Sequence, residues 1–238
     1  MFDIFKLAWL EFKKIFAKKS TYIYLGIMSL TFFIIIDQII KTPGAEKNVF
    51  AVDLIFRPIV QFVIMFQAVT ILAEEFRFGT TTFLLTSPKT RTEILLSKVL
   101  TNILYCFVIG FINFLLLAYY QLGIGQKVVV EYFYSIMTLY LIYGWFINNY
   151  FLFVTIIFKS RATSFVTGLF FLFIFEDILK VLMDKISMAR NFISAIPFDN
   201  IFYFLVNPNL NSYKVYGMIL GGLIFFVASA FIFEKRDV

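Results

Sequence analysis

Six stretches of the chain are almost wholly apolar, and polar or charged residues gather between them. A helix needs about 20 apolar residues to cross the hydrocarbon layer of a bilayer, and each stretch is close to that length. The pattern therefore predicts an all-α membrane protein that forms one transmembrane domain over residues 1–238. The predicted transmembrane helices cover about 21–40, 55–73, 99–122, 132–158, 163–183 and 213–233.

The segment before the first span, residues 2–19, is too charged to cross a membrane. Its aromatic residues nevertheless fall on one stripe of a helix with 3.6 residues per turn, and its lysines lie elsewhere. This pattern is typical of an amphipathic helix that lies in the membrane–water interface with its rings among the acyl chains. The stripe consists of Phe2, Phe5, Trp9, Phe12 and Phe16.

The composition agrees with residence in a membrane. Of 238 residues, 61% are hydrophobic and only 15% are charged, which is too little polar surface for a soluble domain of this size. The mean hydropathy is +0.88. Histidine is absent, which excludes Ser–His nucleophiles and histidine-ligated metals, and the single Cys106 excludes an intrachain disulfide. We expect no catalytic residue, metal or cofactor on this chain.

The positions of Lys and Arg predict the orientation. If the N-terminus is cytoplasmic, the inner connecting segments carry most of the 21 basic residues. Cytoplasmic segments of membrane proteins are enriched in Lys and Arg, so both termini are expected inside.

The segment between the second and third predicted spans, residues 74–98, mixes charge with threonine and leucine. Pro88 ends one element, and Thr90 or Thr92 can serve as the N-cap of a new helix with Glu93 in its first turn. A short helix here, on the inner face and with exposed leucine and polar residues, would suit the docking of a cytoplasmic protein. The alternative is an ordinary polar inner loop.

This segment resembles the permease family of ABC-2 type exporters. The resemblance lies in Glu75, Gly79-Thr80, the run 84–88 (Leu-Leu-Thr-Ser-Pro) and the run 91–98 (Arg-Thr-Glu-Ile-Leu-Leu-Ser-Lys). The family often has a second acidic residue where this chain has Arg77. The residues that the resemblance assigns to ATPase coupling are Glu75, Gly79, Thr80, Leu84, Leu85, Thr86, Ser87, Pro88, Arg91 and Glu93.

The resemblance implies that two six-helix subunits, either two copies of this chain or this chain and a paralogue, line a passage in a bacterial cell membrane. Each would contact an ABC ATPase subunit, which holds ATP and magnesium. The chain itself has no phosphate-binding loop, because none of its 11 glycines is followed by lysine. The coupling helix would fall near residues 82–88, with Leu84 and Leu85 in a cleft of the ATPase and with Glu75 and Arg91 at its rim.

Polar residues inside the predicted spans are candidates for lining the passage, but they can equally form hydrogen bonds between helices. The two acidic candidates also have a structural interpretation, because Lys180 lies close enough along a helix to pair with both at the outer interface. The candidates are Gln61, Gln67, Asn148, Asn149, Glu176 and Asp177.

Three functions follow from these observations. The first is the permease subunit of an ABC-2 exporter whose cargo is an amphipathic peptide, drug or lipid-like molecule, and the segment 74–98 favours it. The second is a secondary transporter or channel. The third is an immunity or scaffold membrane protein without a transport cycle of its own.

Overall fold

The computed structural model describes residues 2–42, 49–79, 90–185 and 212–235, and these residues are almost entirely helical. Five of the helices are long and apolar enough to cross a membrane, at Thr21–Lys41, Ile59–Arg77, Arg91–Gly123, Val130–Phe158 and Val215–Glu234. The prediction of an all-α membrane protein is thereby confirmed. The helices are α1 (Phe2–Ala17), α2 (Lys19–Lys41), α3 (Val49–Arg77), α5 (Arg91–Gly123), α6 (Val130–Phe158), α7 (Arg161–Lys185) and α10 (Ser212–Glu234).

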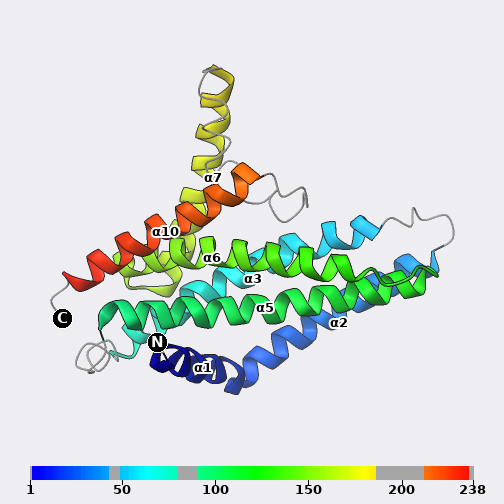
Figure 1. Ribbon diagram of the computed structural model, residues 1–238, viewed down its shortest axis with the longest axis horizontal. Helices are drawn as coiled ribbons and strands as arrows, with labels where there is room; N and C mark the ends of the chain where they lie inside the picture. Colours follow the sequence, from blue (N-terminus) through cyan, green and yellow to red (C-terminus); the bar gives the residue numbers. More distant parts are fainter. Residues whose placement is uncertain (1, 43–48, 80–89, 186–211, 236–238) are drawn as a thin grey trace.

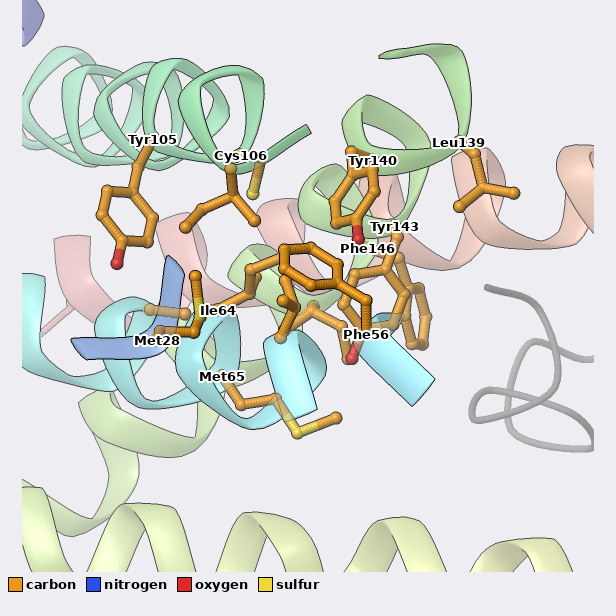
Figure 2. Packing of buried hydrophobic residues seen from close by; sticks show 14 of the residues in the cluster. Met28, Phe56, Ile64, Met65, Tyr105, Cys106, Leu139, Tyr140, Tyr143 and Phe146 are labelled. Atoms are coloured by element: carbon orange, nitrogen blue, oxygen red, sulfur yellow. The ribbon is translucent and has the colours of Figure 1, made fainter. Parts of the chain in front are cut away.

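Helix α6 lies at the centre of the bundle, where it packs against α3, α5, α7 and α10. Figure 2 shows its rings Tyr140, Tyr143 and Phe146 beside apolar residues of α3 and α5, and all three rings are fully buried. Helices α5 and α6 approach each other closely at Gly144, where an added Cβ would lie 2.4 Å from Cys106 Sγ. Small residues permit such approaches between membrane helices, which gain dispersion energy from the close contact.

Helices α2 and α10 lie at the edge of the bundle and expose apolar side chains along their lengths. In a chain that crosses a membrane, these side chains contact the acyl chains of the lipids. Because the acyl chains are as apolar as the side chains, this exposure carries no hydrophobic cost. The exposed residues include Ile23, Ile27, Leu30 and Ile34 on α2, and Leu220, Leu223, Ile224 and Val227 on α10.

Helix α1 is present where the aromatic pattern predicts it, and it packs beside α5 at the same end of the bundle as the C-terminal end of α10 (Figure 1). Its inner side buries Ala8 and Ile15, whereas Phe5 and Trp9 are exposed. Within the stripe, Phe12 lies between Trp9 and Phe16, with ring centroids 5.4 and 4.7 Å away. The side chain of Phe2 lies outside the described residues.

The structure differs from the sequence prediction in one place. No separate short helix follows Pro88; instead α5 runs unbroken from Arg91 to Gly123. Its first turns are already buried, so the expected short helix and the third span form one element. The predicted fifth span, residues 163–183, falls within α7, whose described apolar part covers Arg161–Leu172, so this span stays a prediction. Figure 1 shows that α7 leaves the bundle crosswise to α5 and α6.

Candidate functional site

The residues predicted to couple the chain to an ATPase surround the connection between α3 and α5. Helix α3 ends at Arg77, and Gly79 follows with a φ of 65°. The Gly79 N–H donates to Phe76 O at 3.3 Å, which closes the last turn. Glycine adopts this left-handed conformation without the steric cost that a Cβ brings, so Gly79 has a local role in ending the helix.

Helix α5 begins with a capping box. Thr90 is the N-cap: its Oγ1 accepts a hydrogen bond from Glu93 N at 3.2 Å, and the Glu93 carboxylate accepts one from Thr90 N at 3.0 Å. Two backbone N–H groups that would lack partners at a helix start are satisfied in this way. The prediction of a cap at Thr90 or Thr92 is confirmed for Thr90, and Glu93 stabilises the start of the span.

Arg91 joins the start of α5 to the end of α10. Its Nη1 donates to Phe233 O at 2.7 Å and to Glu234 O at 2.9 Å. Thr92 Oγ1 also donates to Glu234 Oε1, at 2.8 Å. The C-terminal carbonyls of a helix lack partners within the helix and carry partial negative charge, which a guanidinium complements. Arg91 is therefore engaged inside the subunit.

Lys98 is the centre of an ion cluster that joins three helices. Its side chain is only 2% exposed, and its Nζ lies 2.8 Å from Glu75 Oε1 on α3 and 3.1 Å from Glu11 Oε2 on α1. A buried ammonium is strongly disfavoured unless carboxylates neutralise it, and here two do so. Sequence reasoning missed this role, although a lysine inside the apolar run that begins at Ile94 is a signal that could have revealed it.

Two outer ion pairs surround this cluster. Lys14 Nζ lies 2.9 Å from Glu11 Oε1, and Lys18 pairs with Glu74 on α3. The hydrogen bond that Lys14 donates to Glu11 raises the pKa of Lys14, and the negative charges of Glu11 and Glu75 act in the same direction. The first pair lies within α1, and the second joins the residue that follows α1 to the last turns of α3.

A cavity of about 210 Å³ lies between α1 and α3. Its polar lining includes Glu11, Glu74 and Glu75, with Lys14 and Lys18 and, farther along α3, Gln67. Each of these charged side chains already has a partner of opposite charge within the chain. The coupling candidate Glu75 thus lies in a neutralised cluster at the end of α3.

The amides proposed to line a passage are buried within the packing of this subunit. Gln61, Asn148 and Asn149 are fully buried, and Gln67 is 8% exposed. Asn149 Nδ2 donates to Trp145 O at 2.8 Å, which is a contact within α6. Glu176 and Asp177 belong to α7, and their side chains lie outside the described residues.

Within the described part of the chain, two buried amides have no hydrogen-bond partner at either side-chain atom. They are Asn148 and Asn102, the second of which the sequence reasoning did not select. An amide without a partner in an apolar surrounding loses hydration without compensation, and such groups are rare in native structures. These two positions are therefore candidates for sites that change partners during function.

The remaining coupling candidates, Thr80, Leu84, Leu85, Thr86, Ser87 and Pro88, lie outside the described residues. The structure describes the two helix ends on either side of them, at Gly79 and Thr90. The ion pair between Glu75 and Lys98 links the end of α3 to the beginning of α5. Lys98 also pairs with Glu11 of α1, and Arg91 donates a hydrogen bond to the end of α10.

The helical fold, the five candidate spans and the apolar exposed faces define a multi-pass membrane protein. A family model for the ABC-2 family transporter proteins matches residues 6–238, which is nearly the whole chain. The chain belongs to this family, and the predicted resemblance is confirmed. Comparison with curated proteins finds no significant match.

Proposed function

We propose that this chain is the membrane-spanning permease subunit of an ABC exporter and works with a separate ATPase subunit. The observation that carries the proposal is the match to the ABC-2 family over residues 6–238. The described part of the matched region is helical and membrane-like, and we place ATP hydrolysis on the ATPase subunit. ATP and magnesium belong to that partner.

The segment 80–89 is the proposed contact with the ATPase. In this proposal Leu84 and Leu85 insert into a cleft of the partner. Glu75 and Arg91 act from within the subunit, since both have partners there. A movement of this segment, caused by the ATPase, would be transmitted to α1 through Glu75 and Lys98. It would be transmitted to α10 through Arg91.

The proposed arrangement has α1 in the inner membrane–water interface and both termini in the cytoplasm of a bacterium. The exposed rings of Phe5 and Trp9 support this position for α1, because an interfacial helix places such rings among acyl chains. The common location of α1 and the end of α10 supports termini on one side (Figure 1). The proposal keeps residues 163–183 of α7 as the fifth of six crossings in the assembled transporter.

A passage between two permease subunits suits this chain better than a passage through one. The candidate amides of α3 and α6 are enclosed by the subunit's own packing, and α7 leaves the bundle with Phe170 and Phe171 exposed. A second copy or a paralogous permease would cover such a helix. The proposed cargo is an amphipathic peptide, drug or lipid-like molecule.

Reconstitution with the ATPase tests the proposal. We expect the double substitution Leu84→Asp/Leu85→Asp to abolish cargo-stimulated hydrolysis or to release the ATPase, because apolar anchors at the centre of an interface contribute about 2 kcal/mol or more each. Membrane insertion should not change. The matched control is Glu176→Gln, which is predicted to lie on the opposite side of the membrane and should leave ATPase binding intact.

Other outcomes would favour the alternative functions. Cargo movement by the chain alone, driven by an ion gradient, would indicate a secondary transporter or channel. Failure to bind any ABC ATPase, together with no transport, would indicate an immunity or scaffold protein. Wild-type coupling in the double leucine variant would refute the assignment of residues 80–89.

A further inference from the structure

A second cavity, of about 290 Å³, lies at the same end of α3 but is bounded by the turn between α6 and α7. Arg77 from the last turn of α3 lines it, together with Lys159 and Arg161 from that turn. Lys159 has a φ of 55° and ends α6, and α7 begins only two residues later at Arg161. The tight turn thus brings two cations from different helices to one cavity, opposite a third on α3.

These three cations differ from Lys98 and from the two lysines that line the cavity beside α1. Arg77, Lys159 and Arg161 form no ion pair with any described residue, whereas Lys14, Lys18 and Lys98 each have a carboxylate partner. The one carboxylate in the lining, Glu74, already pairs with Lys18. Three like charges around one cavity repel one another unless an anion joins them.

The cavity lies at the depth of lipid headgroups. Two candidate spans, Ile59–Arg77 and Val130–Phe158, end at its wall, and span ends mark the boundary between hydrocarbon and headgroups. The Arg161 guanidinium carbon lies 4.1 Å from the centroid of the Phe66 ring, and that ring is 42% exposed. Arg161 therefore extends over an apolar, lipid-accessible surface and holds its charge beside the cavity.

We propose that this cavity binds the phosphate of an anionic phospholipid, with Arg77, Lys159 and Arg161 as its cationic ligands. Arginine donates paired hydrogen bonds to phosphate, and basic pockets between membrane helices bind anionic headgroups. The N–H groups of the first turn of α7 add a partial positive charge at the same place. The acyl chains would lie along the surface that includes Phe66. The site depends on the membrane position of these span ends and not on the exporter function proposed above.

Lipid retention by the full chain, purified without an ATPase, tests the site. Native mass spectrometry would count phosphatidylglycerol and phosphatidylcholine molecules bound across a titration of each lipid. We expect preferential retention of phosphatidylglycerol by the unaltered chain. The variant Arg77→Gln/Lys159→Gln/Arg161→Gln should weaken that affinity on the order of 100-fold, since each cation near an anionic lipid contributes about fivefold.

The matched control is Lys6→Gln/Lys13→Gln/Lys19→Gln, which removes the same charge from exposed lysines outside the cavity. It should keep the preference for phosphatidylglycerol. If the loss of Arg161 impairs folding, the variant Arg77→Gln/Lys159→Gln retains the contact with Phe66 and should still weaken binding on the order of 20-fold.

Several results would overturn the proposal. Equal retention of the two lipids, or an equal loss in the control variant, would show that the cavity does not select a headgroup. Displacement of phosphatidylglycerol by inorganic phosphate at the same concentration would assign the site to a soluble anion. Unchanged lipid retention in the triple variant would show that the three cations do not bind the headgroup.

Discussion

Replacing Lys98 by methionine should destabilise the protein more than the same replacement of Lys14 or Lys18, the other two lysines that pair with glutamates near α1. The substitution preserves an unbranched side chain in a site that is 2% exposed, but it leaves Glu75 and Glu11 without their shared partner. Breaking a buried ion pair from one side costs about 3–5 kcal/mol. Because Glu11 keeps Lys14, we expect the lower end of that range, about 3 kcal/mol.

The thermal unfolding midpoint, followed by tryptophan fluorescence in a neutral detergent, measures this effect. For a chain of this length about 3 kcal/mol corresponds to a decrease of about 6–12 °C. Lys14→Met is the matched control: it removes the same charge from the same cluster, but that lysine is 66% exposed. Exposed pairs contribute about 0–1 kcal/mol, so the control midpoint should change by no more than about 4 °C.

A triple substitution separates stability from coupling. Lys98→Met/Glu11→Gln/Glu75→Gln removes all three charges, so no buried charge is left unpaired, and the midpoint should recover to within about 1 kcal/mol of the original stability. If Lys98 transmits motion between α1, α3 and α5, cargo-stimulated ATP hydrolysis should stay low in this folded variant. Equal midpoints for Lys98→Met and Lys14→Met would refute the reasoning, because they would show that burial does not amplify the pairing at Lys98.

Three further expectations concern packing, buried polarity and membrane position. Gly144→Ala should cost about 1–3 kcal/mol in unfolding titrations, because the new Cβ would lie 2.4 Å from Cys106 Sγ. Adding Cys106→Ala should restore part of this loss. Unchanged stability of Gly144→Ala would contradict the close approach of α5 and α6. Asn102→Leu and Asn148→Leu should each stabilise the protein by roughly 1–3 kcal/mol and so raise the unfolding midpoint, because neither amide has a hydrogen-bond partner among the described residues. Transport should fall in both variants. A lowered midpoint would mean that the amides do form hydrogen bonds. A cysteine in place of Trp9, with Cys106 replaced by alanine, should react slowly with a water-soluble maleimide in membranes, and rapid labelling would place this face of α1 in water.

Local features of the chain were predictable from the sequence because they depend on neighbouring residues. The length and apolarity of the runs identified the membrane helices, since hydrocarbon excludes any long segment whose backbone is not paired within itself. The cap of α5 was predictable for the same reason, because Thr90 and Glu93 interact across a single turn. Gly79 ends α3 through its own backbone conformation, which likewise needs no distant partner.

Contacts between helices were decided only by the tertiary structure. The distances that matter most join residues far apart in the chain: Lys98 with Glu11, and Arg91 with the carbonyls of Phe233 and Glu234. Such pairs depend on how each helix is rotated about its axis and where it crosses its neighbours. An apolar run is similar on every side, so its sequence does not define that rotation.

The same reason explains the outcome for the polar residues of the spans. Sequence alone identified Asn148 as a polar residue in an apolar helix, but the packing of α6 at the centre of the bundle left it enclosed and without a partner. In the sequence, the three cations Arg77, Lys159 and Arg161 look like ordinary charged residues at the ends of membrane spans. They became one basic cavity only because the turn between α6 and α7 lies against the end of α3, and that placement results from the packing of whole helices.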